Sequence, residues 1–368
     1  MRTLVIWIAA TGCSACGDDD AGPPPTLTAT AARAVAEDAL FHQDPRWLGG
    51  DGAYSIDLGG DRSLWLFGDS FIATSAAHKR SESTFIRNSI AVMTGRDLAT
   101  ATMQFAWRDG TPPTSFVPEV GDHWFWPVGG VRIPDGPLIV FMSELRATPN
   151  EGLGFGGAGQ RSFRVADPSG PPLTWTLEPT TARSPSFDAK ATVACTAVDG
   201  DYLVAVVAGE GAHDARLARW PLGEAGAGDL ADPQWWTGMA WVPETSLGEP
   251  PPIVIPNGAT ECSLHYDAPT QTWIYLWSRG FGETTLAIRT APAVTGPWSS
   301  YRDVLRPDES NVDNAFVYAG KAHPQLRGAD GAIPVTFADN SFTFADLFDP
   351  TREPTLYWPH VARMSLKR

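Results

Sequence analysis

Cysteine is scarce in this chain, which has four cysteines in 368 residues. Two of them stand in the N-terminal segment, so the body of the protein has only Cys195 and Cys262. Two thiols without C-x-x-C spacing do not make a zinc site. In an exported protein the two could form one disulfide, and two buried free thiols are an equal alternative. No other metal-binding motif is visible, so we predict neither a metal nor a cofactor.

Positive charge is also in short supply. Lysine and arginine number 27 against 42 aspartates and glutamates, which gives a formal net charge of -15. Nucleic acid needs a basic face, so a nucleic-acid partner is not expected. The charge fits a neutral or cationic partner, or serves solubility. No helical or apolar feature indicates an obligate dimer, and we expect a monomer.

Long hydrophobic runs are missing, and the longest candidate lies at the N-terminus. Arg2 is followed by an apolar run at 4–10, which is too short to span a membrane, and then by small residues. This order indicates a secretory signal over 1–16, with Cys16 as the lipidated residue of a bacterial lipoprotein. Residues 17–25 then read as a solvated tether. We therefore expect export and a lipid anchor in the membrane, facing the periplasm or the cell surface. An ordinary signal peptide without lipid is the alternative.

Helical periodicity is absent over most of the chain, apart from a short helix-compatible piece at 31–40. The 36 glycines, 32 prolines and 15 tryptophans favour many short strands joined by tight turns. A recurrence of about 60 to 75 residues appears in these strands. The second strands of the repeating unit are 63–67, 137–141, 202–206, 273–277 and 333–337. The third strands are 88–92, 162–165, 216–219, 285–288 and 357–361.

Tryptophan marks the expected fourth strand of four units, at Trp107, Trp175, Trp241 and Trp298. The fifth unit lacks such a strand, and residues 26–31 could supply it from the other end of the chain. Five units of four strands predict an all-β chain that forms a single five-bladed β-propeller over 26–368. A pair of β-sandwiches or a solenoid with coincidental spacing is the alternative.

The innermost strands of a propeller converge on a central funnel, where ligands bind. Counting back about twelve residues from each second strand reaches a ring of five positions, uncertain by one residue. These positions are Asp51, Trp126, Ala194, Glu261 and Lys321. The ends of the second strands supply a further set, namely Asp69, Ser143 or Glu144, Ala208, Arg279 and Asp339. We expect several of these side chains to share one mouth.

Asp51 and Asp69 are the favoured catalytic pair, because each follows or precedes a glycine beside an apolar run. Burying an acid at such a point costs desolvation energy, and paired carboxylates are what glycoside hydrolysis requires. A plain turn aspartate is the alternative for Asp51. Glu261 and Glu144 are reserve candidates for general acid, although Glu261 could equally pair with Arg279 or Lys321.

Six further residues are predicted to bind substrate. Trp47 and Trp126 lie near the glycine-rich mouth and could stack on sugar rings, while most other tryptophans pack between blades. The polar candidates are Asn88, Arg279, Lys321 and His323. His323 could instead cap a turn, and Asn88 could contact a neighbouring blade.

The sequence resembles the family of former unknown function linked to endo-D-arabinanases, among five-bladed propeller glycosidases that act on furanosides. The markers are Trp47…Gly-Gly-Asp51-Gly-Ala-Tyr-Ser, Leu64-Trp-Leu-Phe-Gly-Asp69-Ser, Arg87-Asn-Ser-Ile, Thr260-Glu261, Thr290-Ala…Gly296-Pro-Trp298 and Leu356-Tyr-Trp-Pro. They span about 45–365. Ser70 stands where threonine is commoner, a mild departure.

The resemblance implies hydrolysis of α-furanosidic bonds in a neutral polysaccharide, with D-arabinan and endo action favoured, and places the chemistry on Asp51 and Asp69. We expect Asp51 to stay ionised as base or nucleophile, and Asp69 to be the proton donor with a pKa raised by burial and by its neighbour's charge. The alternatives are a non-catalytic glycan-binding lipoprotein, an exo-acting furanosidase, and a pyranoside-specific hydrolase or lyase.

Overall fold

A computed structural model describes residues 27–149, 154–209, 211–280 and 284–368. The signal, the tether and Cys16 therefore lie outside the described residues. Strands dominate the described chain, and the one α-helix, α1, spans only Leu222–Ala227. None of the described helices is long and apolar enough to cross a bilayer.

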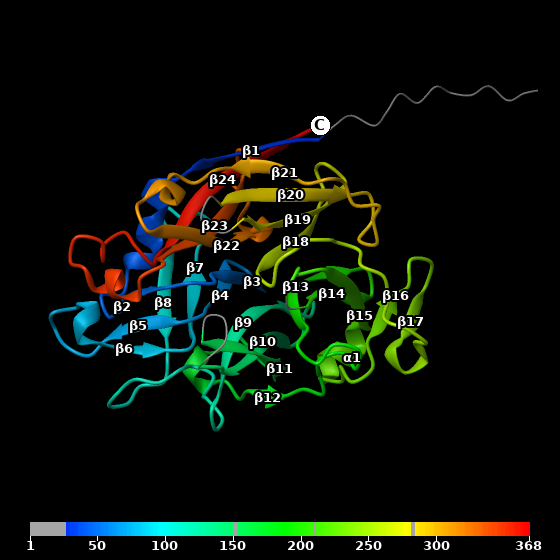
Figure 1. Cartoon of the computed structure of the whole chain (residues 1–368), viewed down its shortest axis with the longest axis horizontal. Helices are drawn as coiled ribbons and strands as arrows, with labels where there is room; N and C mark the ends of the chain where they lie inside the picture. The colour runs from blue at the N-terminus through cyan, green and yellow to red at the C-terminus, as the bar shows by residue number, and fades with distance from the viewer. Residues whose placement is uncertain (1–26, 150–153, 210, 281–283) are drawn as a thin grey trace, which may run out of the picture.

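Four of the five larger sheets follow one another along the chain (Figure 1). The first sheet contains β3 (Tyr54–Gly59), β4 (Arg62–Phe67), β7 (Ser89–Thr94) and β8 (Thr102–Ala106). The second contains β9 (His123–Arg132), β10 (Leu138–Ala147), β11 (Phe155–Val165) and β12 (Glu178–Pro179). The third contains β13 (Thr192–Asp199), β14 (Tyr202–Ala208), β15 (Ala215–Pro221), β16 (Gln234–Trp236) and β17 (Trp241–Pro243). The fourth contains β18 (Cys262–Asp267), β19 (Thr272–Arg279), β20 (Thr285–Ala291) and β21 (Arg302–Leu305).

The fifth sheet joins the two ends of the described chain. It contains β22 (Ala315–Ala322), β23 (Ile333–Ser341), β24 (Pro359–Lys367) and, at its edge, the N-terminal strand β1 (Thr28–Arg33). β1 pairs antiparallel with β24 over six residue pairs, from Thr28 with Lys367 to Arg33 with Ala362. The prediction that an N-terminal segment completes the fifth unit is confirmed, with the strand two residues further along.

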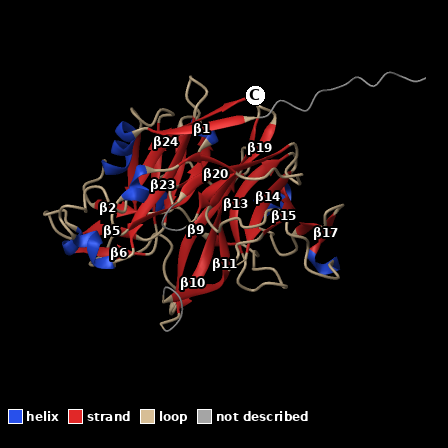
Figure 2. Ribbon diagram, turned by 45° about the horizontal axis from the view of Figure 1, so that its top comes forward, coloured by secondary structure: helices blue, strands red, loops and turns tan. Residues whose placement is uncertain are grey.

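Contacts between first strands order the sheets in a ring. β3 contacts β9, β9 contacts β13, β13 contacts β18, and β18 contacts β22. The ring continues from the fifth sheet to the first through His323 on the fifth and Ser55 on the first, whose Nδ1 and Oγ atoms are 2.5 Å apart. Apolar cores fill the spaces between neighbouring sheets. Strands make up most of the regular secondary structure, and the described helices are short (Figure 2). Such a ring of four-stranded antiparallel sheets is typical of a β-propeller.

Three details of the fold differ from the sequence-based expectation. The tryptophans do not mark fourth strands: Trp107 follows β8, Trp175 follows the 3-10 turn η3 (Pro172–Thr174), Trp298 precedes β21, and Trp241 begins an additional fifth strand. The rings of Trp107, Trp175 and Trp298 pack from connecting segments onto the cores between sheets, and the ring of Trp241 does so from β17. The piece at 31–40 is divided between β1 and the 3-10 helix η1 (Val35–His42).

A small extra sheet was not predicted. It contains β2 (Trp47–Gly50), β5 (Ser70–Ala73) and β6 (Ser83–Ile86), and it lies beside the first and fifth sheets (Figure 1). The remaining 3-10 turns are η2 (Arg80–Glu82), η4 (Glu244–Ser246), η5 (Asp308–Asn311), η6 (Pro324–Leu326) and η7 (Phe344–Phe348). The two turns between this sheet and the first sheet carry Asp51 and Asp69.

Candidate active site

Asp51 sits in a tight turn between β2 and β3. Its carbonyl accepts hydrogen bonds from the Ala53 and Gly68 amides, both at 3.0 Å. Gly52 and Ala53 have φ of 82° and 49°, a left-handed conformation that glycine adopts without cost and alanine adopts with strain. The turn is therefore fixed against the Gly68 turn, which carries Asp69.

Gly68 is required for the two aspartates to approach each other. A Cβ atom at this position would lie 2.3 Å from Asp51 Oδ1, which is far inside contact distance. The glycine in Phe67-Gly68-Asp69 therefore leaves room for the neighbouring carboxylate. This close approach explains the glycine before Asp69, whereas the left-handed φ of Gly52 explains the glycine after Asp51.

Two tyrosine hydroxyls from the fifth sheet and its loop contact Asp51. The Tyr318 hydroxyl donates to Asp51 Oδ2 at 2.6 Å. The Tyr357 hydroxyl lies 3.2 Å from the same oxygen and 3.1 Å from the Asp69 carbonyl oxygen. Tyr357 therefore links the two acidic turns directly.

Asp69 has a different set of partners. Trp126 Nε1 donates to Asp69 Oδ1 at 2.8 Å, and the Arg87 guanidinium lies 3.4 Å from Oδ2. Arg87 also stacks over the Trp124 ring, at 4.4 Å from its centroid. Asp69 thus has a cation beside it, whereas the direct partners of Asp51 are neutral hydroxyls.

These surroundings give the two carboxyl groups different pKa values. Burial, then the charges of Asp69 and Glu261, raise the pKa of Asp51 to about 8. Burial also raises the pKa of Asp69, but Arg87 and the Trp126 hydrogen bond oppose it and leave it at about 6. These contacts favour the protonated form more strongly at Asp51, which has no cation in direct contact, than at Asp69, which has Arg87 beside it. This order is the reverse of the roles expected from the sequence.

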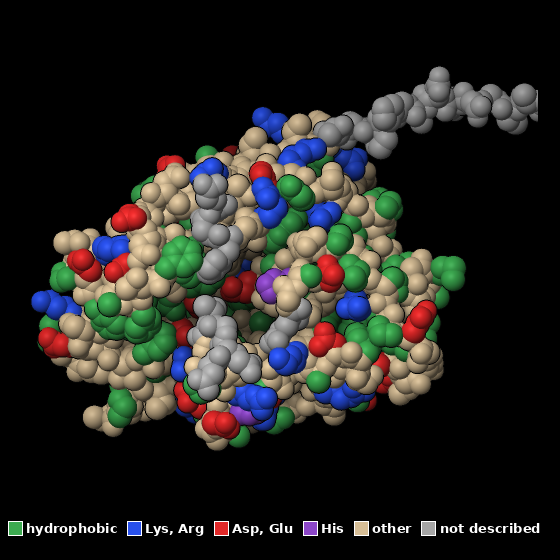
Figure 3. Space-filling model, viewed as in Figure 1, with side chains coloured by type: hydrophobic (Ala, Val, Ile, Leu, Met, Phe, Trp, Pro, Cys, Tyr) green, Lys and Arg blue, Asp and Glu red, His purple; other side chains and the backbone are tan. Residues whose placement is uncertain are grey.

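Glu261 and Lys321 form an ion pair near Asp51. Lys321 Nζ lies 3.3 Å from Glu261 Oε1, donates to the Ala319 carbonyl at 2.9 Å, and sits 4.1 Å from the Tyr54 ring centroid. The Lys321 ammonium is almost fully buried, and burial lowers its pKa. Glu261 is one-third exposed, at 33% of its side chain, and so remains accessible to a ligand. The space-filling view shows acidic side chains within a central hollow on this face (Figure 3).

Glu144 does not fit the role of a reserve acid. Its carboxylate accepts hydrogen bonds from Arg161 Nε at 3.0 Å and from Arg161 Nη2 at 3.1 Å. It also lies 2.6 Å from His123 Nδ1. Burial alone would raise its pKa, but these partners outweigh burial and lower it. An ionised carboxylate held by an arginine cannot donate a proton, so the expectation for Glu144 was wrong.

Three predicted binding residues are structural instead. Trp47 is fully buried, donates to Ser89 Oγ at 3.0 Å and packs on Phe67. His323 is buried between Ser55 and Thr336, and burial lowers its pKa to about 3, which keeps the ring neutral.

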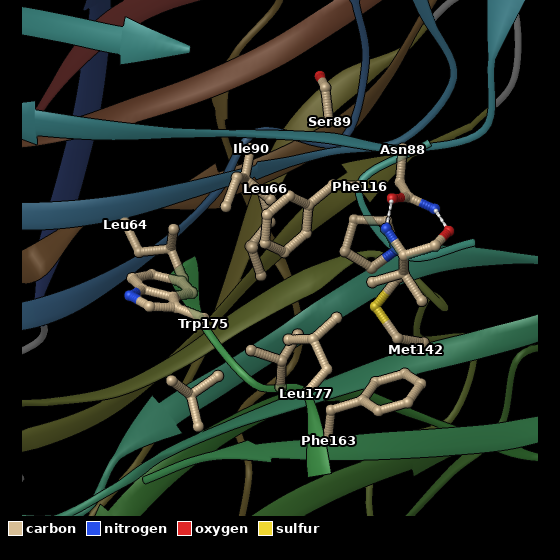
Figure 4. Close-up of a pocket in the computed structure, with 14 residues that line it drawn as sticks. Leu64, Leu66, Asn88, Ser89, Ile90, Phe116, Met142, Phe163, Trp175 and Leu177 are labelled. Carbon is tan, nitrogen blue, oxygen red and sulfur yellow. Dashed lines mark hydrogen bonds between the residues drawn. The ribbon is translucent and has the colours of Figure 1, made fainter. Parts of the chain in front are cut away.

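Asn88 lies beside an apolar space between the first and second sheets (Figure 4). Its side chain exchanges hydrogen bonds with the Val117 backbone at 2.7 and 3.1 Å and donates to the Phe125 carbonyl at 2.9 Å. Asn88 therefore holds two chain segments together.

The two remaining predicted residues divide between the site and its surroundings. Trp126 is half-buried, touches Asp69, and has its ring 4.9 Å from that of Phe155, so its stacking role stays a prediction. Arg279 instead pairs with Asp303 on β21, at 3.0 and 2.6 Å, and lies over the Tyr301 ring. Its guanidinium is engaged by the outer strand of the fourth sheet.

The sequence did not identify Tyr318 and Tyr357 as site residues, and it did not identify Arg80 as the residue that supports Tyr357. Arg80 is almost fully buried and donates to the carbonyls of Leu48, Leu347 and Leu356, at 2.8, 3.2 and 2.6 Å. The Leu356 contact fixes the residue before Tyr357, which has a φ of 67°. Tyr357 stands in the marker Leu356-Tyr-Trp-Pro, which was the available signal. Tyr318 had no local signal.

The two buried cysteines are free thiols, with Sγ atoms 2.7 Å apart on the first strands of the third and fourth sheets. Within the ranges that the structure covers, no three His, Cys, Asp or Glu side chains gather in a metal-binding group.

The fold and the site together define an all-β protein in which a partly exposed Asp51 and a buried Asp69 lie next to each other at the centre of a ring of sheets. Residues 36–365 match the family described as Domain of unknown function (DUF5005), and the chain belongs to that family. No curated protein matches it in sequence.

Several solved structures are similar in fold. A "putative hydrolase" from Bacteroides ovatus ATCC 8483 superposes with a TM-score of 0.70 at 16% identity, covering 91% of this chain and 90% of the other. The endo-arabinase of Bacteroides thetaiotaomicron VPI-5482 gives a TM-score of 0.44 at 11% identity, covering 83% and 92%. A GH43_1 enzyme from Xanthomonas citri gives 0.47 at 12% identity, covering 92% and 91%. The similarity to the Bacteroides ovatus structure is one of fold.

Proposed function

We propose that this protein is a five-bladed β-propeller glycoside hydrolase that cleaves α-furanosidic bonds within a neutral polysaccharide, with D-arabinan as the favoured substrate and endo action. The observation that carries the proposal is the Asp51–Asp69 pair, in which two adjacent carboxyls have different partners and different pKa values. Glycoside hydrolysis needs one protonated and one ionised carboxyl at the same bond.

The partners of each acid assign the roles. Asp51, with its higher pKa, donates the proton to the leaving glycosidic oxygen. Asp69, stabilised as a carboxylate by Arg87 and Trp126, either takes a proton from the water that attacks the anomeric carbon or attacks that carbon itself as the nucleophile. Glu261 faces the same region and supplies a negative charge that opposes ionisation of Asp51.

The test measures release of reducing ends from arabinans, fructans, xylans and arabinogalactan by a soluble form that begins after the tether. Cleavage of D-arabinan to a ladder of oligosaccharides is expected, and a single released sugar would indicate exo action instead. Asp51→Asn and Asp69→Asn should each lower kcat by at least about 10²-fold, the lower end of what a positioned proton-transfer group contributes. Both variants should keep the melting temperature of the parent. Glycan binding without any cleavage would select the non-catalytic alternative.

We also propose that the protein acts outside the cytoplasm as a lipoprotein anchored through Cys16. A polysaccharide substrate is too large to reach an enzyme inside the cell, which agrees with the export signal expected at 1–16. Cys16→Ala should move the full-length protein from the membrane pellet to the soluble fraction. If the variant stays in the membrane pellet, Cys16 is not the anchor.

A further inference from the structure

An aromatic patch lies beside the candidate active site, and neither the fold nor the catalytic pair requires it. Phe342 and Phe344 have 55% and 56% of their surface exposed, and Phe85 and Phe348 are partly exposed. We call these four residues the phenylalanine patch. In Figure 3, apolar side chains gather over the area where Figure 1 places β5 and β6, next to the central hollow. Exposed apolar groups that cluster in this way commonly mark a binding surface.

Two series of contacts connect the patch to the acids. On one side, the Phe342 and Phe316 rings are 4.8 Å apart, and Phe316 and Tyr318 are 5.4 Å apart. The Tyr318 hydroxyl in turn contacts Asp51. The patch is therefore continuous with the surroundings of Asp51.

The second series leads to Asp69. The Phe344 and Phe85 rings are 5.8 Å apart, and the Arg87 guanidinium lies 5.7 Å from the Phe85 centroid. Arg87 contacts Asp69 at 3.4 Å. A chain molecule bound across the acid pair would meet the patch on leaving it.

The turn η7, which carries Phe344 and Phe348, is held in place by buried and hydrogen-bonded residues. η7 is anchored by Leu347, which is fully buried against the small sheet. Asp346, on the same turn, accepts hydrogen bonds from Ser341 Oγ at 2.6 Å, Asn314 Nδ2 at 2.8 Å and Arg352 Nη1 at 2.5 Å. The rings are thus presented in a fixed arrangement, which lowers the entropy cost of binding.

We propose that the phenylalanine patch binds sugar units of the polysaccharide chain that lie away from the cleaved bond. The inference rests on the proposed function. Aromatic faces bury the apolar C–H faces of sugars, and the exposed rings of Phe342 and Phe344 provide such faces. A neutral chain also suits a patch whose exposed groups are uncharged.

The test uses Phe342→Ala/Phe344→Ala, with Tyr266→Ala as a matched control because Tyr266 is an exposed aromatic, at 46%, on β18 of the fourth sheet. Binding to D-arabinan is measured by affinity electrophoresis in the Asp51→Asn background. The double variant should bind about tenfold more weakly, the loss of about 1.4 kcal/mol expected from two stacking rings. The control should bind normally. In the active background, kcat/KM should fall for the polymer and stay unchanged for a short aryl furanoside.

Three outcomes would overturn the inference. If the parent cleaves D-arabinan and the double variant binds and cleaves it equally well, the patch has no role in binding sugar. If the double variant loses activity equally on the short substrate, its effect is not that of a distant binding surface. If it changes only the oligomeric state in gel filtration, the patch is a protein interface. A parent that cleaves no polymer but binds it through the patch would reject the proposed hydrolysis and keep the surface.

Discussion

The behaviour of the two aspartates depends on side chains that come from distant parts of the chain. Tyr318 and Tyr357 lie 267 and 306 residues beyond Asp51, and both place a hydroxyl at its Oδ2. A hydroxyl donor favours the ionised form, so it limits the rise in pKa that burial causes. The pKa of Asp51 is therefore set by two opposing effects. Burial raises it, and the Tyr318 hydroxyl lowers it.

Tyr318→Phe tests this balance. Removal of the 2.6 Å hydrogen bond should raise the pKa of Asp51 further, because the carboxylate loses a donor. The alkaline limb of the activity profile should move up by about one pH unit, the order expected for a hydrogen bond to a charged group. The measurement is kcat/KM against pH.

Tyr54→Phe is the matched control for that experiment. The Tyr54 hydroxyl is buried near the same group of residues and has no hydrogen-bond partner in the described part of the chain. Its removal should leave the alkaline limb where it is. Equal shifts in both variants would mean that the tyrosine hydroxyls act through general packing and not through Asp51.

The acid pair and its neighbour Trp126 could be found from the sequence, whereas the two tyrosines that contact Asp51 could not. Glycine beside Asp51 and Asp69 reports a close approach of two turns, and the structure shows that approach at Gly68. The glycine-rich neighbourhood of Trp47 predicts exposure, but the ring is fully buried. Local spacing does not show that Phe67, Phe105 and Trp358, from other parts of the chain, cover this ring.

At the scale of elements, the edge strand β1 is joined to β24 by a buried charge network as well as by backbone pairing. Arg33, at the end of β1, donates to Asp38 at 2.7 Å, and His360 on β24 lies 3.3 Å from Asp38 and 3.2 Å from Asp339. Asp339 in turn accepts a hydrogen bond from the Tyr357 backbone amide at 2.8 Å. The strand that completes the fifth sheet is thereby connected to the loop that reaches Asp51.

This network predicts a pH dependence of stability. Burial would lower the pKa of His360, but the neighbouring carboxylates of Asp339 and Asp38 raise it to about 9. Because the folded value exceeds the unfolded value of about 6.5, the stabilisation is fully present below that pH and is lost as pH rises through about 9. The difference in unfolding free energy between the parent and His360→Gln should therefore shrink by about 3 kcal/mol or less between pH 6 and pH 10.

His265→Gln provides the control. Burial lowers the pKa of His265 to about 4, so this ring is neutral throughout that range. Its effect on the unfolding free energy, measured by urea titration at each pH, should be constant from pH 6 to pH 10. A constant difference for His360→Gln as well would contradict the charged state assigned to His360.

Some elements were predictable from local pattern and others were not. The second strands were located because they are nearly continuous apolar runs bounded by turn residues, as in 202–206 and 273–277. The small sheet could not be predicted from local pattern. β5 is buried along its whole length, and its partner β2 is separated from it in the chain by two strands of the first sheet. Trp107, in a connecting segment, is buried as deeply as Trp273 in a strand, so a tryptophan does not by itself identify a fourth strand.

At the scale of the whole molecule, the period of about 60 to 75 residues was enough to predict a ring of repeated sheets. The number of strands in each sheet was harder to predict, since β12 and β16 contain two and three residues. The central position of the acids followed from the ring, because equivalent positions of repeated units converge there.

The pairing of the first and last described strands has a consequence for the order of folding. The Thr28 hydroxyl bonds to the Lys367 carbonyl across 339 positions of sequence. Contacts of such long separation form late and slow the folding reaction, because the intervening chain must be ordered first. A nascent chain therefore carries β1 as an unpaired edge until its last strand is available. During that interval the protein is most exposed to strand exchange with a second copy and to capture by chaperones.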